Sequence, residues 1–177
     1  MQIRTAELSD AQAIADIYTP IVRETAISFE SEPPSAAEMA GRMARTLESH
    51  PWLVAVGDGE ILGYAYASQF RARAAYRWTC EVTAYVDTAT RRGGVGRALY
   101  DRLLPILRRQ HFHTAVAIVT LPNEASIGFH QSFGFEPAGI RQKYYENVED
   151  AIVMWCHDIQ SADYQRRLDE LRQAEAS

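Results

Sequence analysis

The strongest chemical signal in the chain is an arginine- and glycine-rich segment that follows an apolar stretch. Residues 78–86 predict a strand, and Arg91-x-x-Gly94-x-Gly96 follows it where a helical pattern begins at Val95. The first N–H groups of a helix have no partner within the helix, and glycines allow a ligand close to the backbone. The segment therefore suits a pyrophosphate group, although a plain turn is the alternative. It matches neither the G-x-G-x-x-G fingerprint nor a P-loop, which argues against redox and nucleotide-hydrolysing enzymes.

A single carboxylate lies inside the same apolar stretch. Glu81 is costly to bury in a strand unless it is paired or used chemically. Such a group can take a proton from an attacking amine, either directly or through one water molecule. A Glu81 that faces the surface is the alternative.

Two arginines lie two residues apart, just after another predicted strand. In extended geometry Arg71 and Arg73 point to the same side, and a pair of guanidinium groups is well suited to bind a carboxylate. A solvated basic patch shared with Arg77 is the alternative.

Alternating strand and helix patterns are expected to position these residues. The predicted strands cover residues 2–5, 52–56, 61–67, 78–86, 113–121, 135–145 and 150–159. A type I′ turn at Asp58-Gly59 joins the second and third strands as a hairpin. The predicted fold class is α/β (α+β), a mixed sheet of about seven strands flanked by helices.

Helix starts are marked by capping patterns. Ser9 and Gln12 have the capping-box spacing and open a first helix, and Ser35 caps a second that runs to about Glu48. Further helices are expected over residues 95–109, with a kink at Pro105, and over residues 123–132. Residues 161–177 form a C-terminal tail helix after a domain of residues 1–160.

Composition excludes several classes of protein. The chain has 177 residues and a net charge of −5, which fits one domain and lacks the basic face of a nucleic-acid binder. No apolar run is long enough to span a bilayer, and the start at Met1 does not resemble a signal peptide, so we expect a cytoplasmic protein. Cys80 and Cys156 lack metal-ligand spacing, so we expect two buried free thiols and no metal site.

The Arg91–Gly96 motif after a strand, together with the order of elements, resembles the GNAT superfamily of N-acetyltransferases. Asn123-x-x-Ser126-x-x-x-His130 resembles the superfamily's second signature, whose Asn contacts the pantetheine arm. The resemblance implies that acetyl-CoA is the co-substrate and is bound by Ala84, Tyr85, Val86, Arg91, Arg92, Gly93, Gly94, Val95, Gly96, Arg97, Asn123 and Ser126. The backbone of residues 84–86 would hold the thioester oxygen and the pantetheine amides.

Within the superfamily, the chain resembles phosphinothricin and methionine sulfoximine acetyltransferases, which have His where other members have Tyr at position 130. The matching stretches are residues 51–55, 63–67, 71–81, 85–86 and 121–123. This resemblance implies Glu81 as general base, His130 as the acid that protonates the leaving thiolate, and an amino-acid site formed by Phe29, Glu30, Arg71, Arg73 and Tyr76. A partly buried structural His130 remains the alternative.

The C-terminal segment departs from that family. Residues 143–154 look like those of ribosomal-protein alanine acetyltransferases, whose catalytic Glu belongs to the strand formed here by residues 114–120, which contain no carboxylate. We expect direct acetyl transfer to the α-amine of a small amino acid, in a protein that is also expected to be a homodimer. Protein N-terminal acetylation and a non-catalytic acyl-CoA sensor are the alternatives.

Overall fold

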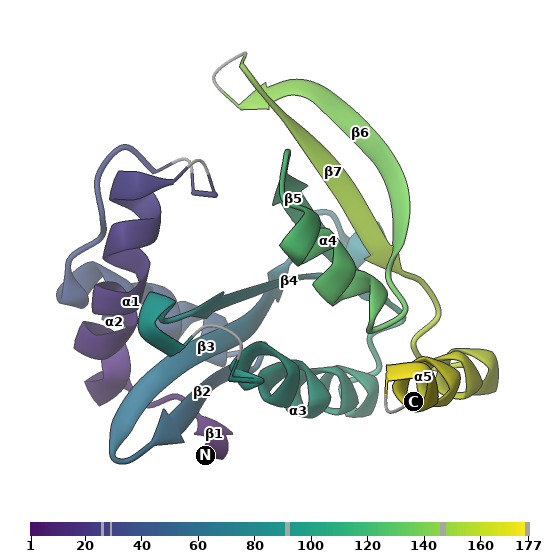
Figure 1. Ribbon diagram of the computed structural model, residues 1–177, viewed down its shortest axis with the longest axis horizontal. Coiled ribbons are helices and arrows are strands. Elements are labelled where there is room, and N and C mark those ends of the chain that lie inside the picture. The colour runs from purple at the N-terminus through teal and green to yellow at the C-terminus, as the bar shows by residue number, and fades with distance from the viewer. Residues whose placement is uncertain (26, 29, 91–92, 146–147, 176–177) are drawn as a thin grey trace. The chain divides into compact units, whose positions relative to one another are not determined.

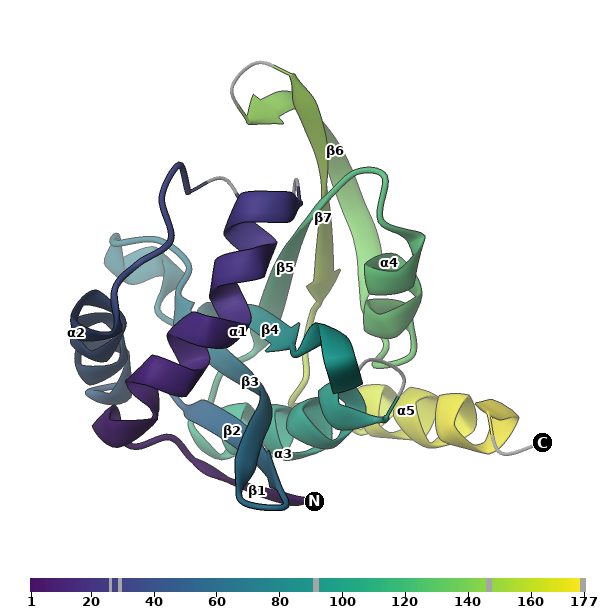
Figure 2. The same cartoon turned by 60° about the vertical axis from the view of Figure 1, so that its left-hand side comes forward.

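The computed structural model describes residues 1–25, 27–28, 30–90, 93–145 and 148–175. The chain forms two compact units, one of residues 1–68 and 82–107, the other of residues 69–81 and 108–177. Figures 1 and 2 show their elements from two sides. No helix in the described residues is long and apolar enough to cross a membrane.

A seven-stranded mixed sheet has the order β1-β2-β3-β4-β5-β7-β6, which confirms the predicted fold class. Its strands are β1 (Gln2–Thr5), β2 (Trp52–Gly57), β3 (Glu60–Gln69), β4 (Thr79–Val86), β5 (Thr114–Thr120), β6 (Glu136–Tyr145) and β7 (Glu149–Cys156). Most neighbouring strands are antiparallel, whereas β4 and β5 pair in parallel from Thr79 opposite Thr114 to Glu81 opposite Val116. Positive φ angles at Asp58 and Gly59 confirm the predicted hairpin turn.

Two amphipathic helices, α1 (Ala11–Glu24) and α2 (Ala36–Leu47), pack against each other in the first unit. Ser35 caps α2 in a capping box with Glu38, as predicted. The predicted Ser9–Gln12 box is wrong. Glu7 and Asp10 form the box instead, around a short 3₁₀ turn, because the Asp10 carboxylate accepts the Glu7 N–H at 2.8 Å and also pairs with Arg4 at 2.7 Å.

Helix α3 (Val95–Arg109) follows β4 and is continuous through Pro105. Its buried residues recur at helical spacing: Val95, Leu99, Tyr100, Leu103, Leu104 and Leu107. This apolar stripe holds the start of α3 in place.

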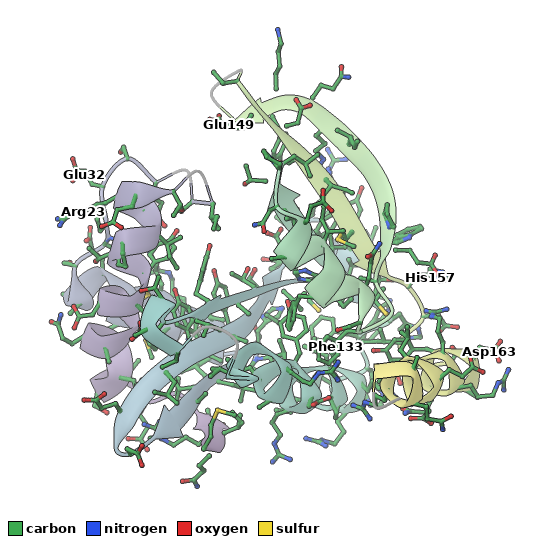
Figure 3. The ribbon with its side chains drawn as sticks, in the orientation of Figure 1. Arg23, Glu32, Phe133, Glu149, His157 and Asp163 are labelled. Carbon is green, nitrogen blue, oxygen red and sulfur yellow. The ribbon has the colours of Figure 1, made fainter. Side chains whose placement is uncertain are left out.

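The second unit contains β5, helix α4 (Glu124–Gln131), the long β6–β7 ribbon and helix α5 (Ala162–Glu175). The predicted tail helix is present and tightly joined to this unit. The Tyr164 hydroxyl donates to the Phe133 carbonyl at 3.2 Å, and Tyr164 and Leu168 are buried. Figure 3 shows the Asp163 side chain pointing outward at the start of α5. Cys80 and Cys156 are buried free thiols, as predicted.

Candidate acetyl-CoA and acceptor sites

The end of β4 lies unusually close to β3, and Gly63 is the reason. A Cβ atom at Gly63 would lie 2.9 Å from the Tyr85 carbonyl oxygen, 3.0 Å from Val95 Cγ1 and 3.2 Å from Val86 Cα. These distances are shorter than ordinary contacts between non-bonded atoms. Glycine therefore lets β3 lie against the backbone that is expected to hold the thioester, a role that the sequence analysis did not assign to Gly63.

Hydrogen bonds to Leu62 on β3 hold the loop between β4 and α3. The Leu62 carbonyl accepts the Asp87 N–H at 2.9 Å and the Thr90 hydroxyl at 3.2 Å. The Thr90 carbonyl in turn accepts the Gly93 N–H at 3.2 Å. Thr90 thus links β3 to the predicted pyrophosphate loop, a contact that no local sequence pattern indicates.

The start of α3 has the features of an anion site. Gly94 has a φ of +73°, which favours glycine, and a Cβ there would meet no atom within 4 Å. The N-terminal end of a helix carries a partial positive charge, so the start of α3 favours a negatively charged ligand. Arg91 and Arg92 lie outside the described residues.

Glu81 is partly buried on β4, at the end of the segment that pairs with β5. Burial raises the pKa of its carboxyl group, and the positive charge of Arg141 on β6 opposes that rise. A carboxylate whose pKa lies above its ordinary value is a better proton acceptor near neutrality. The environment of Glu81 therefore fits a general base, and Arg141 is a neighbour that sequence reasoning missed.

The arginine pair follows β3 in an exposed segment. The Arg71 guanidinium lies 5.3 Å from the ring centre of Phe70 and 5.4 Å from that of Tyr76. The two rings pack edge to face, with their centres 5.9 Å apart. They hold the Arg71 head group by cation–π contacts, whereas Arg73 is exposed before the 3₁₀ turn of residues 74–76. Phe70 is a further residue that the sequence analysis did not identify.

Asn123, Ser126 and His130 lie together on α4. Asn123 caps this helix, because its side-chain oxygen accepts the Ser126 N–H at 3.1 Å. The buried His130 donates from Nδ1 to the Ser126 carbonyl at 2.7 Å, since a carbonyl can only accept. Burial lowers the pKa of His130, and the bond to Ser126 opposes that effect. A neutral imidazole that carries its proton on Nδ1 has no proton on Nε2 to donate. This protonation state fits a structural histidine better than the expected proton donor.

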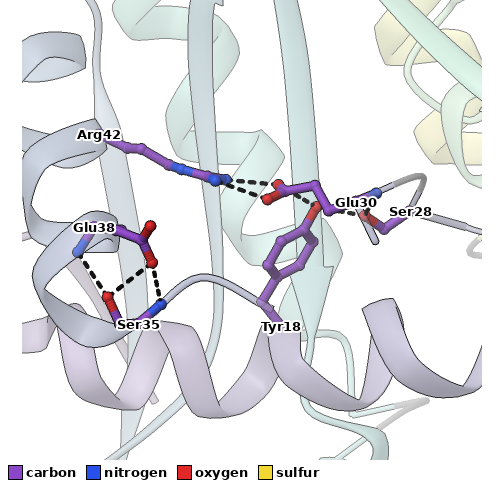
Figure 4. Close-up of polar contacts among 6 residues, drawn as sticks. All are labelled: Tyr18, Ser28, Glu30, Ser35, Glu38 and Arg42. Atoms are coloured by element: carbon purple, nitrogen blue, oxygen red, sulfur yellow. Dashed lines mark hydrogen bonds and ion pairs between the residues drawn. The ribbon is translucent and has the colours of Figure 1, made fainter. Parts of the chain in front are cut away.

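Glu30 lies in the connection between α1 and α2, and two other side chains bind its carboxylate there. It forms a two-pronged ion pair with Arg42 at 2.6 and 2.7 Å, and it accepts the Tyr18 hydroxyl at 3.0 Å (Figure 4). The bonds from Arg42 are the main reason that the pKa of Glu30 is lowered. Phe29 lies outside the described residues.

An aromatic cluster in the first unit supports β4 from one side. Tyr85 packs on Tyr18 and Tyr64, with ring centres 5.0 and 5.5 Å apart. Trp52 stacks on Tyr66 at 4.2 Å and on Tyr64 at 5.9 Å. These contacts fix the Tyr85 side chain and, with it, the strand end that is expected to bind the cofactor.

A cavity of about 540 Å³ in the first unit is a poor candidate for either ligand. None of the predicted site residues lines it, and its lining includes the carboxylates of Asp16, Glu60 and Asp87. These negative charges would repel the phosphates of a coenzyme. The described part of the chain also has no group of three or more His, Cys, Asp or Glu side chains placed to hold a metal ion.

The predicted site residues fall into two groups, one in each unit. The first unit contains the described coenzyme residues of β4, the following loop and α3, together with Glu30. The second contains Glu81, the Arg71–Tyr76 segment and the three α4 residues. Strand β4 carries members of both groups, because Glu81 precedes Ala84, Tyr85 and Val86 along it.

One protein family and several known proteins are similar to this chain over most of its length. The acetyltransferase (GNAT) domain family matches residues 3–155. A phosphinothricin N-acetyltransferase of Streptomyces viridochromogenes is 36% identical over 139 residues, which cover 78% of this chain and 76% of that protein. An L-methionine sulfoximine/L-methionine sulfone acetyltransferase of Salmonella typhimurium is 36% identical over 136 residues, covering 76% and 80% of the two chains.

Two solved structures are also similar. A phosphinothricin acetyltransferase from Sinorhizobium meliloti, in complex with acetyl-CoA, superposes with a TM-score of 0.84 at 31% identity, covering 92% of this chain and 90% of that one. A ribosomal-protein-alanine N-acetyltransferase from Brucella melitensis has a TM-score of 0.85 at 28% identity, covering 89% and 99%.

Proposed function

Because the chain belongs to the GNAT family of acetyltransferases, we propose that it moves acetyl directly from acetyl-CoA to the α-amine of a small amino acid. The chain is an acetyl-CoA-dependent N-acetyltransferase of the phosphinothricin and methionine sulfoximine type. Direct transfer to an amino acid is supported above all by Glu81, the partly buried carboxylate with a raised pKa that precedes the expected thioester-binding residues on β4.

In this proposal Glu81 prepares the acceptor for attack. An ammonium group has no lone pair, so Glu81 first removes a proton from it, directly or through a water molecule. The amine nitrogen then forms a bond to the acetyl carbon, and the carbon–sulfur bond breaks to release the CoA thiolate. The nitrogen gives up its second proton to the thiolate or to solvent, which leaves the neutral amide. Backbone N–H groups of residues 84–86 stabilise the thioester oxygen as it becomes negative.

The first unit supplies groups that fit acetyl-CoA. The N-terminus of α3 and the side chain of Arg97 offer positive charge to the pyrophosphate, and Gly94 leaves space for its close approach. We assign Asn123 and Ser126 to the pantetheine arm, on the basis of their place at the start of α4.

The arginine segment supplies groups that fit the acceptor. Arg71, held between Phe70 and Tyr76, would bind the acceptor's carboxylate together with the exposed Arg73. The thiolate can take its proton from solvent or from the protonated Glu81. His130 therefore need not be the general acid, and its bond to Ser126 supports a role in holding α4.

A thiol-release assay with acetyl-CoA tests this function. The acceptor panel contains phosphinothricin, methionine sulfoximine, methionine sulfone, polyamines and peptides that begin with Ala. Rapid turnover of the amino acids supports the proposal, provided that Glu81→Gln lowers kcat without changing the Kd of acetyl-CoA. Acetyl-CoA binding without turnover of any amine would refute it and indicate a sensor. Accumulation of acetyl-enzyme without acceptor would refute direct transfer.

Protein N-terminal acetylation is the second candidate. The β6–β7 segment, residues 143–154, favours it, as does the similarity to the Brucella melitensis structure. Strand β5 nevertheless has the sequence TAVAIVT and carries no carboxylate that could act as base. Turnover of peptides that begin with Ala, with little turnover of free amino acids, would replace the first proposal with this one.

We further propose a cytoplasmic homodimer in which residues 1–160 form the catalytic domain and residues 161–177 a helical tail. The exposed side chains of Ile140 and Trp155 on the β6–β7 ribbon support a self-associating surface. Sedimentation equilibrium tests the dimer, and a monomer at micromolar concentration would refute it.

A further inference from the structure

The connection between α1 and α2 is tied down by one polar network, and Arg42 is at its centre. Arg42 projects from α2 and binds both carboxylate oxygens of Glu30, twelve residues earlier, at 2.6 and 2.7 Å. The Tyr18 hydroxyl, from α1, donates to Glu30 at 3.0 Å and shares a hydrogen bond of 2.6 Å with Ser28. Figure 4 shows these side chains converging from both helices and from the connection.

The same network reaches β4. The Tyr18 ring packs on the Tyr85 ring, with centres 5.0 Å apart, so the residue that anchors the connection also contacts the strand expected to hold the thioester. Burial raises the pKa of the Tyr18 hydroxyl to about 12, so it stays protonated and can donate to Glu30. A continuous path of contacts therefore runs from Arg42 through Glu30 and Tyr18 to Tyr85.

We propose that Arg42 and Tyr18 are positioning residues for the acceptor: they hold the α1–α2 connection at Ser28 and Glu30 against β4. This inference rests on the proposed function. It also changes the role of Glu30, which was expected in the amino-acid site and acts in this proposal as an anchor for the connection. Its two carboxylate oxygens already accept three hydrogen bonds from protein groups.

The acceptor kinetics distinguish positioning from direct binding. Arg42→Met removes the guanidinium, and we expect the KM of the acceptor to rise about tenfold while the KM of acetyl-CoA stays the same. Arg42→Lys restores the charge without the two-pronged geometry, so it should recover part of the loss. Tyr18→Phe keeps the ring on Tyr85 but removes the hydroxyl, and should give a smaller rise. Arg45→Met, an exposed arginine on the same helix, is the matched control and should behave as wild type.

Glu30→Gln tests the anchor role. If Glu30 acts only through Arg42, the double variant with Arg42→Met should be no worse than Arg42→Met alone. A much larger effect of Glu30→Gln than of Arg42→Met would mean that Glu30 binds the acceptor directly, and would overturn the proposal. Equal changes in both KM values, or an acceptor KM within twofold of wild type in both Arg42→Met and Tyr18→Phe, would also overturn it.

Hydrogen exchange separates this inference from the proposed function, because it needs no turnover. The backbone amides of Ser28 and Glu30 should exchange about tenfold faster in Arg42→Met than in wild type or Arg45→Met. Unchanged exchange would show that Arg42 does not hold the connection, even if the enzyme acetylates amino acids. If the wild type acetylates no amine, the proposed function is refuted. Faster amide exchange in Arg42→Met would then show only that Arg42 anchors the connection, and would not support a role in positioning an acceptor.

Discussion

The close approach of β3 to β4 predicts a large effect of one methyl group, in the variant Gly63→Ala. The added Cβ would lie 2.9 Å from the Tyr85 carbonyl oxygen and 3.2 Å from Val86 Cα. Both are backbone atoms and cannot rotate away, so the strand end must move by roughly 0.5 Å to regain ordinary contact distances of about 3.5 Å. Val95 Cγ1, at 3.0 Å, blocks movement of the new methyl toward α3.

The magnitude follows from two opposing terms. Overpacking costs about 1–3 kcal/mol, and replacing glycine in a strand recovers about 0.5–1 kcal/mol of backbone entropy. The difference is a net loss of at most about 2.5 kcal/mol and centred near 1 kcal/mol, which lowers the Tm of a chain of this size by about 2–4 °C. If residues 84–86 bind the thioester as proposed, a displaced strand end weakens those hydrogen bonds, so the Kd for acetyl-CoA should rise about tenfold.

Thermal unfolding and isothermal titration with acetyl-CoA measure the two effects. Gly41→Ala on α2 is the control, because its Cβ would meet only Arg45 Nη1, at an ordinary 3.5 Å. That variant should be as stable as wild type or gain up to about 1 kcal/mol from helix propensity. The reasoning is refuted if Gly63→Ala has the wild-type Tm and binds acetyl-CoA with the wild-type Kd.

Three further predictions concern charge and anchoring. As the pH falls and Glu81 becomes protonated, the kcat/KM for the acceptor should fall. Arg141→Met should move this fall to higher pH, because it removes a charge that lowers the pKa of Glu81. An unchanged pH profile would exclude that coupling. NMR titration should give His130 a pKa below the ordinary value of about 6.5; a higher value would restore it as a candidate acid. Tyr164→Phe should cost about 1 kcal/mol in urea unfolding by removing the bond to Phe133; wild-type stability would show that this bond contributes nothing.

The sequence predicted those parts of the fold that depend on neighbouring residues. The capping box of Ser35 and Glu38 and the turn at Asp58-Gly59 are local, and both are confirmed. The capping box predicted at the start of α1 is wrong because Asp10 forms an ion pair with Arg4 on another element. This ion pair competes with the local Ser9 pattern. An ion pair with the preceding strand thus decided the case in which the capping pattern failed.

The same distinction applies to the candidate site. The sequence singled out Glu81 as a lone carboxylate in an apolar stretch and the glycines before α3 by their spacing, because these signals lie within their own segments; their roles stay predictions. Gly63 and Arg42 could not be identified in this way. The importance of Gly63 depends on the atoms that lie across from it on β4, and that of Arg42 on a carboxylate twelve residues away. Such roles follow from packing and can be recognised only in a three-dimensional structure.

The aromatic cluster has an optical consequence. Trp52 is 3% exposed and stacked on Tyr66, whereas Trp78 and Trp155 are 44% and 42% exposed. Trp52 belongs to the first unit and the other two to the second. The emission of Trp52 should therefore be blue-shifted and shielded from iodide, whereas that of Trp78 and Trp155 should be red-shifted and quenched by iodide. Fluorescence with single tryptophans replaced by Phe can thus report on each unit separately, including whether the two units unfold together.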